Sequence, residues 1–358
     1  MWLRPEGEYV TAENNSRLSN VDSARFSMRT TDTPKIIAVA GGRSGVGKTA
    51  FATMLGICLA GFERQVILID LDFSDANVQG FLKLNAEKSL NTYFAGRSIH
   101  LAQVIQHTLF DRLDAITLQS DAFETPSCKP WQKRRLFRQM GELTADYLIL
   151  DLGSASSDVG LDLFMRADYG IVVSANDVFS IVNTYSFIRS ALLRNLQRRF
   201  FDNRAIVRML DECGLLVDTK LVKPLKSIIR QMDPSTQAKL LDLQEGWNFR
   251  PKVVLNFARE GDEIDDFFLL GPMTKDLLNI ELEYWGHIRH DENVGRAVRL
   301  SRPDKLLLQN GMASEDVVRL VIRNFLARDI HLGDQNPLWP DKKNMFSKMN
   351  FDALKKAS

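Results

Sequence analysis

The 358-residue sequence predicts an α/β fold whose mostly parallel, doubly wound sheet carries a helical insertion. Three observations predict it. Short apolar runs recur from Lys35 onward, stretches of helical length separate these runs, and a glycine-rich turn joins the first run to the first helical stretch. Runs that are apolar on both faces are typical of parallel strands covered by helices on both sides.

Seven runs are expected to form strands, in chain order residues 36–40, 66–70, 113–118, 147–152, 170–175, 253–257 and, more weakly, 284–288. Residues 185–250 instead carry apolar residues at helical spacing, as in SFIRSALLRNLQRRF and KLVKPLKSIIRQM. We therefore expect a helical insertion near residues 185–250 of one domain that spans residues 35–328. The polar residues 1–34 and the lysine-rich residues 329–358 are expected to be tails, and residues 1–34 are alternatively upstream sequence from a wrong start codon.

The composition excludes several classes of protein. With 46 basic and 45 acidic side chains the net charge is +1, which excludes a globally basic DNA-coating protein and an acidic disordered chain. The cysteines, Cys58, Cys128 and Cys213, lie too far apart for a disulfide framework or a C-x-x-C metal site. No apolar run approaches the roughly 20 residues that span a bilayer, and the first residues do not resemble a secretory signal. We therefore expect a cytoplasmic protein.

The glycine-rich turn after the first predicted strand matches the phosphate-binding P-loop pattern. Its glycines allow successive N–H groups to face phosphate oxygens, and the helix that starts near Lys48 adds the positive end of its dipole. Lys48 supplies charge to the outer phosphates, and the Thr49 hydroxyl is suited to ligate Mg²⁺. The residues expected to bind the nucleotide here are Gly42, Arg43, Ser44, Gly45, Val46, Gly47, Lys48, Thr49 and Ala50.

Two aspartates follow later strands. Asp72 lies just beyond the run 66–70, and Asp151 lies within YLILDL. Carboxylates at the ends of parallel strands share one sheet edge with the phosphate loop. Asp72 is therefore a candidate to orient water or to join the magnesium shell, and Asp151 a candidate Walker B acid that holds Mg²⁺. For either residue alone, a carboxylate that caps a helix or loop is the competing interpretation.

Together these segments carry a resemblance to a known family. GGRSGVGKT, DLDFSDANV and YLILDLGSAS resemble the MinD/ParA superfamily of deviant Walker A ATPases, P-loop NTPases of the SIMIBI class. The DxDFxxANV form is nearest the MinD-like FlhG/FleN branch, which regulates flagellar number and placement. SANDVFSI, VLNFAR and WGHIRHDENVGRAVRLSRP are similar to further family segments, so the resemblance covers most of 35–180 and 252–304.

The resemblance implies a slow, partner-stimulated, Mg²⁺-dependent ATPase that cycles between ATP and ADP. In this family two subunits close face to face around two ATP molecules, and hydrolysis opens them, so we expect an ATP-dependent homodimer that positions or assembles a cellular structure. The resemblance assigns Lys48 and Thr49 to the P-loop pair, Asp72 to water positioning, Asp151 to Walker B and Asn256 to an adenine contact. A regulatory protein partner is implied as well.

The sequence departs from the family pattern in two places. One bears on ATP hydrolysis, and the other lies beside the nucleotide base in the family. The signature lysine of the family is replaced by Arg43, and the next glycine by Ser44. Arginine keeps the positive charge, and its guanidinium could make two hydrogen bonds to a phosphate held by the other subunit of a dimer. Serine at position 44 costs backbone freedom if that residue needs a positive φ. Arg289 stands where the family usually has proline beside the base. A nucleotide-binding scaffold with little hydrolysis is therefore the alternative function.

Two segments suggest a cellular surface. The tail 341–358 has a basic, moderately amphipathic pattern that predicts peripheral membrane association, with a frayed or core-docked terminus as the alternative. The arginines at 189, 194, 198, 199, 204 and 208 are interpreted as the solvated side of a buried helix, with ParA-like nonspecific DNA binding as the alternative.

Other functions of related folds fit less well. Iron–sulfur carriers and arsenite pumps need paired cysteines, the tyrosine cluster of bacterial tyrosine kinases is missing from the last 30 residues, and no substrate motif supports a small-molecule ligase. The DQAxxLR-like element that often begins FlhG proteins is not found in residues 1–34.

Overall fold

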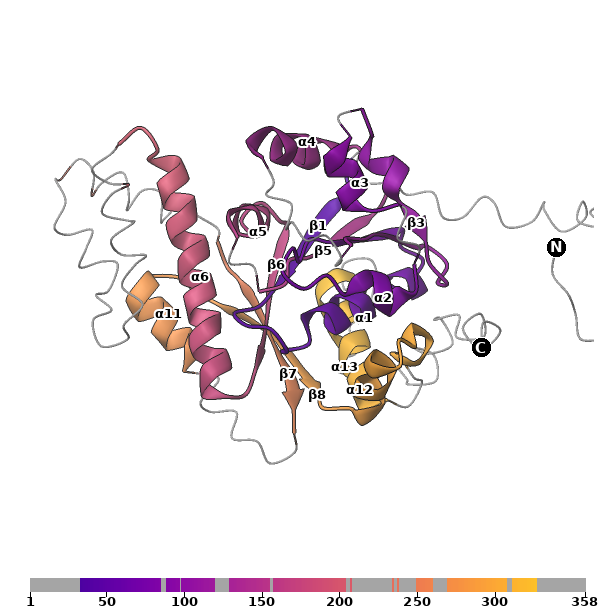
Figure 1. The fold of residues 1–358 in the computed structure, drawn as a ribbon. Helices are drawn as coiled ribbons and strands as arrows, with labels where there is room; N and C mark the ends of the chain where they lie inside the picture. The colour runs from indigo at the N-terminus through magenta and orange to yellow at the C-terminus, as the bar shows by residue number, and fades with distance from the viewer. Residues whose placement is uncertain are drawn as a thin grey trace, which may run out of the picture. The chain divides into compact units, whose positions relative to one another are not determined.

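Eight strands form one sheet in the computed structural model (Figure 1). The structure describes residues 33–84, 88–96, 98–119, 129–154, 157–203, 249–259, 269–307 and 311–326, with residues 207, 234 and 237. The strands lie in the order β3-β4-β2-β5-β1-β6-β7-β8. They are β1 Lys35–Ala40, β2 Val66–Asp70, β3 Gln106–His107, β4 Leu113–Ile116, β5 Tyr147–Asp151, β6 Tyr169–Ala175, β7 Lys252–Ala258 and β8 Glu283–Arg289.

All seven predicted strands are present and run parallel to one another, which confirms the predicted fold class. The sequence analysis missed β3, a two-residue edge strand that pairs antiparallel with β4. A pair of residues is too short to give an apolar alternation, so no pattern marked it.

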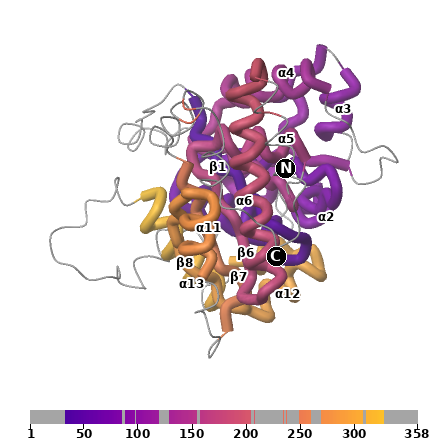
Figure 2. Tube along the Cα trace, turned by 90° about the vertical axis from the view of Figure 1, so that its left-hand side faces the viewer, coloured from indigo at the N-terminus to yellow at the C-terminus, as the bar shows by residue number. Residues whose placement is uncertain are grey.

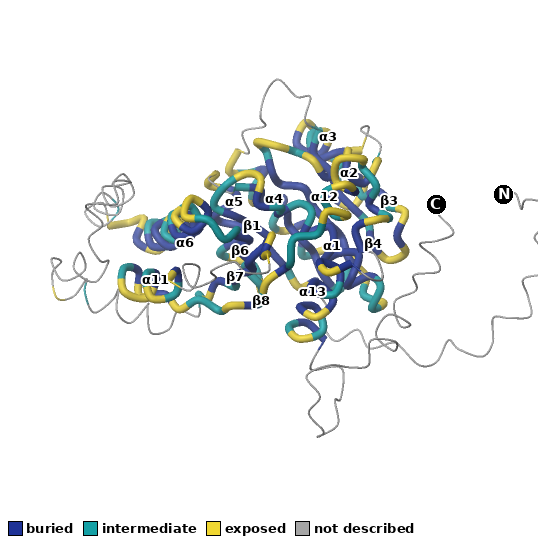
Figure 3. The backbone as a smooth tube through the Cα atoms, turned by 90° about the horizontal axis from the view of Figure 1, so that it is seen from below, coloured by how far each residue is buried: buried dark blue, intermediate teal, exposed yellow. Residues whose placement is uncertain are grey.

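Helices cover both faces of the sheet (Figures 1 and 2). Ile37 and Val39 pack in one core with the buried residues of α1 and α13, whereas Ala38 and Ala40 pack in a second core with those of α5 and α6. Figure 3 shows the resulting burial of the central strands. The helices are α1 Lys48–Gly61, α2 Val78–Leu82, α3 Leu90–Ala95, α4 Pro130–Gly141, α5 Asp158–Phe164, α6 Val178–Arg199, α11 Leu270–Leu278, α12 Glu292–Arg299 and α13 Met312–Val321, with 3₁₀ turns Leu101–Val104 and Pro303–Lys305 and a π-helical turn Ile322–Leu326.

The predicted start of the insertion falls inside a helix of the main fold. Helix α6 begins at Val178, where the Asp177 side chain accepts hydrogen bonds from the Ser180 N–H and hydroxyl at 2.9 and 2.6 Å. Ile188 and Leu192 of α6 are fully buried in the core. Residues 185–199 therefore cover the sheet, and most of the remaining predicted insertion lies outside the described residues, as do the tails 1–32 and 327–358.

Two of the candidate DNA-binding arginines lie in an ion-pair network. Arg194 and Arg198 each contact the buried Asp162 of α5, at 3.3 and 2.9 Å, and Arg194 also contacts Asp158 at 2.9 Å. Lys133 of α4 pairs with Asp162 as well. These contacts tie α4, α5 and α6 together, which favours the structural interpretation of Arg194 and Arg198.

Arg204 and Arg208 lie outside the described residues. Among the helices that the structure describes, none is long and apolar enough to cross a membrane.

Candidate functional site

The phosphate loop connects β1 to α1 and lies directly against α6. Gly45 and Gly47 have φ values of +82° and +84°, which favour glycine. A Cβ on Gly42 would lie 2.1 Å from the Asn183 backbone carbon, and one on Gly47 would lie 2.3 Å from the Asn256 amide nitrogen. Close packing and backbone geometry therefore both require glycines in this loop.

Ser44 is exposed and is not among the residues with a positive φ. The expected backbone cost of replacing the family glycine is therefore absent in this conformation.

Lys48 begins α1 and is almost fully buried. Its ammonium group donates a 2.7 Å hydrogen bond to the Arg43 carbonyl oxygen, which folds the side chain back over the loop. Burial lowers the pKa of Lys48, and the nearby carboxylates of Asp151, Asp72 and Asp75 act in the opposite direction. The lysine thus lies between the phosphate loop and an acidic group of side chains.

Asp70 and Asp151 are neighbours in register at the ends of β2 and β5, and both are fully buried. Asp70 accepts hydrogen bonds from the Asp72 and Val78 N–H groups, each at 3.1 Å, so it shapes the turn after β2. Burial, followed by the proximity of Asp151, raises the pKa of Asp70 well above its usual range. Asp70 is the first aspartate of the DLD segment, and its place at the end of a strand is the signal that could have identified it.

Asp151 offers an unused oxygen at the phosphate loop. Its side chain accepts hydrogen bonds from the Thr49 hydroxyl and, at 3.4 Å, from the Gly153 N–H. Its buried Oδ2 has no hydrogen-bond partner among the described residues. Burial raises the pKa of Asp151 to about 6, with the Thr49 hydrogen bond acting against that shift.

This arrangement fits Mg²⁺ bound together with phosphates. A buried carboxylate oxygen without a partner, next to a threonine hydroxyl, supplies the hard oxygen ligands that Mg²⁺ prefers. Within the described ranges, no group of three or more His, Cys, Asp or Glu side chains is placed to hold a metal ion. Mg²⁺ commonly keeps several waters and substrate phosphates as ligands, so a larger protein cage is unnecessary.

Asp72 lies against the end of β5. Its Oδ1 accepts hydrogen bonds from the Ser74 N–H at 3.1 Å, the Ser74 hydroxyl at 2.5 Å and the Asp75 N–H at 3.1 Å. Gly153 has φ +62°, and a Cβ placed on it would lie 2.0 Å from Asp72 Oδ2. The structure therefore brings Asp72 to the same sheet edge as Lys48 and Asp151, as the sequence predicts.

Replacing Gly153 by alanine should displace the Asp72 carboxylate and place a Cβ at a positive φ. We expect a loss of roughly 1–3 kcal/mol in the free energy of unfolding, measured by urea denaturation. Gly80→Ala is the control, because nothing lies within 4 Å of a Cβ in that exposed position of α2, and it should leave stability unchanged or raise it slightly. Equal losses in both variants would contradict the assigned contact.

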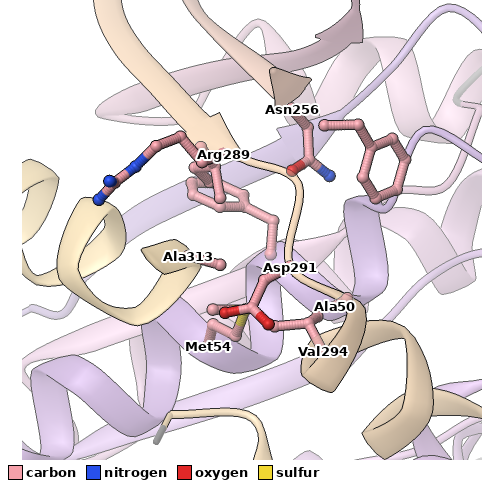
Figure 4. A pocket seen from close by; sticks show the side chains of 10 residues that line it. Ala50, Met54, Asn256, Arg289, Asp291, Val294 and Ala313 are labelled. Atoms are coloured by element: carbon pink, nitrogen blue, oxygen red, sulfur yellow. The ribbon is translucent and has the colours of Figure 1, made fainter. Parts of the chain in front are cut away.

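A hollow beside the start of α1 is the candidate base site (Figure 4). Ala50 and Met54 of α1 line it from one side, and Asn256 and Phe257 of β7 from another. Asn256 Nδ2 donates a 2.9 Å hydrogen bond to the Val46 carbonyl oxygen. Asn256 therefore holds the phosphate loop while it borders the hollow, and its adenine contact stays a prediction.

Arg289 clamps the end of β8 to α13. Its Nε and Nη2 atoms donate to the two oxygens of the buried Asp316 at 2.8 and 2.9 Å, and its backbone N–H donates to Asp316 Oδ2 at 2.9 Å. Further contacts join Nη2 to Glu315 at 3.3 Å and to the Met312 carbonyl oxygen at 3.2 Å. Figure 4 shows the guanidinium directed away from the hollow. Arg289 thus supports a wall of the candidate base site.

Replacing Arg289 by alanine should weaken ATP binding about tenfold, because the wall of the hollow loses its anchor on α13. Binding of a fluorescent ATP analogue would measure the effect. Arg302→Ala is the matched control: Arg302 makes a similar forked pair with Asp304, at 2.8 and 2.7 Å, but does not line the hollow. Unchanged affinity in the Arg289 variant would contradict the supporting role.

Arg43 contacts a carboxylate of its own chain. Its Nη1 lies 3.5 Å from Asp177 Oδ1, and both side chains are about two-fifths exposed. The buried Arg43 Nε has no hydrogen-bond partner among the described residues. Asp177 was not among the predicted site residues, although its place after a strand and before a helix is typical of a helix cap.

Residues 37–303 match the family model described as the CobQ/CobB/MinD/ParA nucleotide binding domain. The chain belongs to this family. Among curated members, antiactivator FleN of Pseudomonas aeruginosa is 24% identical over 274 residues, which cover 75% of this chain and 78% of FleN. The predicted resemblance to the MinD/ParA superfamily, nearest the FlhG/FleN branch, is confirmed.

Solved structures agree on the fold of this MinD/ParA-like chain. Septum site-determining protein MinD of Pyrococcus horikoshii, complexed with Mg-ADP, has a TM-score of 0.54 and 15% identity, covering 82% of this chain and 97% of that one. The MinD protein of Aquifex aeolicus has a TM-score of 0.51 and 16% identity, covering 86% of this chain and all of that one. These similarities establish a P-loop α/β fold.

Proposed function

We propose that the chain is a slow, Mg²⁺-dependent ATPase that acts as an ATP-dependent dimerisation switch. The observation that carries the proposal is the unpartnered Asp151 oxygen beside Thr49, at the edge where the phosphate loop presents Lys48. Mg²⁺ bound there would neutralise phosphate charge. Lys48 would bind the outer phosphates, and Asp72 would orient water.

The useful output of such a switch is the change between monomer and dimer. FleN is named as an antiactivator, and MinD of Aquifex aeolicus was solved in complex with MinC. By analogy we propose that the dimer engages a regulatory protein and controls the positioning or assembly of a flagellum-, division- or partition-like structure. We place this activity in the cytoplasm, with the tail 341–358 as a candidate peripheral membrane contact.

A second candidate function is a nucleotide-binding scaffold with little hydrolysis. The contact of Arg43 with Asp177 favours it, because an arginine held by its own chain is less available to a phosphate across a dimer. Turnover with and without cellular partners distinguishes a switch from a scaffold. Nonspecific DNA binding is a third candidate, and strong salt dependence of binding would support it.

Size-exclusion chromatography with light scattering tests the proposal. The wild type should be monomeric with ADP and dimeric with ATP and Mg²⁺. A protein that stays monomeric with ATP and Mg²⁺ as well as with ADP would contradict the switch in the isolated protein.

Replacing Asp72 by alanine should preserve ATP binding and prolong the dimer, because hydrolysis would no longer open it. Asp72→Asn keeps an acceptor for the Ser74 and Asp75 N–H groups, so it separates loss of the charge from loss of the turn. Dimer lifetime is measured by dilution into excess ADP. An Asp72 variant that binds ATP but stays monomeric would refute this role.

A further inference from the structure

Phe257 has a backbone conformation that is unusual for its place in a strand. It lies within β7, yet its φ is +60°, in the left-handed region that L side chains rarely adopt. The other non-glycine residues with a positive φ in the described ranges lie in turns or at the ends of helices. Strain of this kind persists where neighbouring contacts enforce it, and it is found most often at binding sites.

Contacts on both sides of Phe257 fix this conformation. On one side, Asn256 Nδ2 donates a 2.9 Å hydrogen bond to the Val46 carbonyl oxygen of the phosphate loop. On the other side, the His290 N–H donates a 2.7 Å hydrogen bond to the Ala258 carbonyl oxygen. The pairing of β7 with β8 also shifts register over this stretch. The backbone at Phe257 is therefore held at both ends and has little freedom to relieve the strain.

The side chain of Phe257 lies where the phosphate loop meets the hollow beside α1. A Cβ on Gly47 would lie 3.0 Å from Phe257 Cζ, so the ring extends to the backbone of the loop. Phe257 also lines the hollow, together with Ala50 and Met54 (Figure 4). It is 39% exposed, and the His290 ring lies against it with the ring centroids 6.1 Å apart. Part of this apolar ring is therefore accessible to a ligand that enters the hollow.

We propose that the Phe257 ring stacks on the base of the bound nucleotide and favours purines over pyrimidines. This inference rests on the proposed ATP binding and assigns a residue that selects the base. Aromatic side chains stack on the flat faces of bases, and a purine offers two fused rings to that contact where a pyrimidine offers one. The rest of the hollow suits a flat apolar surface, since its other apolar lining residues are Ala50, Phe51, Met54, Ile288, Val294 and Ala313.

Replacing Phe257 by glycine tests the inference, because glycine accepts the positive φ and removes the ring. With Mg²⁺ present, the affinity for ATP should fall about tenfold, and the preference for ATP over CTP should narrow. The affinity for inorganic tripolyphosphate, which has no base, should stay within about twofold of the wild type. Isothermal titration calorimetry measures all three ligands.

Two further variants provide the controls. Phe257→Tyr keeps an aromatic ring and should bind ATP like the wild type. Phe201→Gly removes a phenylalanine that is 79% exposed just beyond the end of α6 and does not line the hollow, so it should also leave ATP affinity unchanged.

The outcomes separate the inference from the proposed function. Weaker ATP binding by Phe257→Gly with normal tripolyphosphate binding, recovered in Phe257→Tyr, would support stacking on the base. Equal losses for both ligands would overturn it, because the ring would then support the phosphate loop instead of the base. Unchanged ATP affinity in Phe257→Gly would overturn it as well. A wild type that binds neither ATP nor tripolyphosphate would refute the proposed function itself.

Discussion

The Lys48→Ala protein is expected to remain monomeric when ATP and Mg²⁺ are added. Lys48 is the buried cation between the phosphate loop and the carboxylates of Asp72 and Asp151. Hydrogen bonds to charged groups contribute about 1.5–3 kcal/mol each, so removal of this ammonium group should weaken ATP binding by roughly 10- to 100-fold. The same truncation removes the hydrogen bond to the Arg43 carbonyl, so the loop also loses an internal support.

Binding of a fluorescent ATP analogue and light scattering would be measured on the same samples. Lys305→Ala is the control, because Lys305 is about half exposed and pairs with Asp304 away from the loop. Lys48→Arg should not restore binding, since a Cβ on Gly41 would already lie 2.9 Å from Lys48 Cδ and the space is narrow. An Lys48→Ala protein that dimerises with ATP would disprove the assignment.

Asp151→Asn is expected to remove the dependence of ATP affinity on Mg²⁺. An amide in place of the unpartnered oxygen is a poor ligand for Mg²⁺. In the wild type, the Mg²⁺-dependent gain in affinity should fall as the pH drops below about 6, because burial raises the pKa of Asp151 to about 6 and the protonated acid does not bind the ion. The Asn variant should show no such profile, and the exposed Asp276→Asn should behave like the wild type.

The raised pKa of Asp151 also affects the stability of the nucleotide-free protein. Acidic pH weakens Mg²⁺-dependent ATP binding, but it should favour the folded state of the free protein. The pKa of Asp151 is higher in the folded chain than in the unfolded chain, so the folded state binds the proton more tightly. Its contribution to stability is therefore greatest at acidic pH and declines as the pH rises through about 6. At pH 7.5 the Asn variant should be more stable than the wild type by up to about 3 kcal/mol, with a smaller difference at pH 5. Urea unfolding at both pH values checks the sign.

The sheet was predictable because most strands are buried on both faces. The predicted strands 66–70 and 147–152 are apolar up to their last residues; the first ends where β2 ends, and the second extends one residue beyond β5. The order of the strands in space was not predictable from these runs, and neither was β3. The start of the insertion was placed too early, because residues 185–199 of α6 have the helical apolar spacing of an insertion but pack in the core of the main fold.

The fold brings together residues that carry a local sequence signal, whereas no local signal marks the long-range contacts. Lys48, Asp72 and Asp151 each follow a strand in a recognisable pattern, and the fold brings them to one edge. Arg289 of β8 and Asp316 of α13 are 27 positions apart in the sequence. No sequence pattern near either residue predicts their pairing. Arg289 was expected beside the base, but its charged end turns away from the hollow.

The clamp between Arg289 and Asp316 makes the two positions interdependent. Asp316 receives both the guanidinium and the backbone N–H of residue 289. Restoring the family proline would remove both donors in one step, because proline has no N–H, and would leave a buried carboxylate with far fewer donors. Arg289→Pro should therefore be much less damaging when Asp316 is replaced by an apolar residue of similar size. In relatives of this chain, an acid at position 316 should therefore occur together with a residue other than proline at position 289. Substitutions at the two positions should be coupled during evolution.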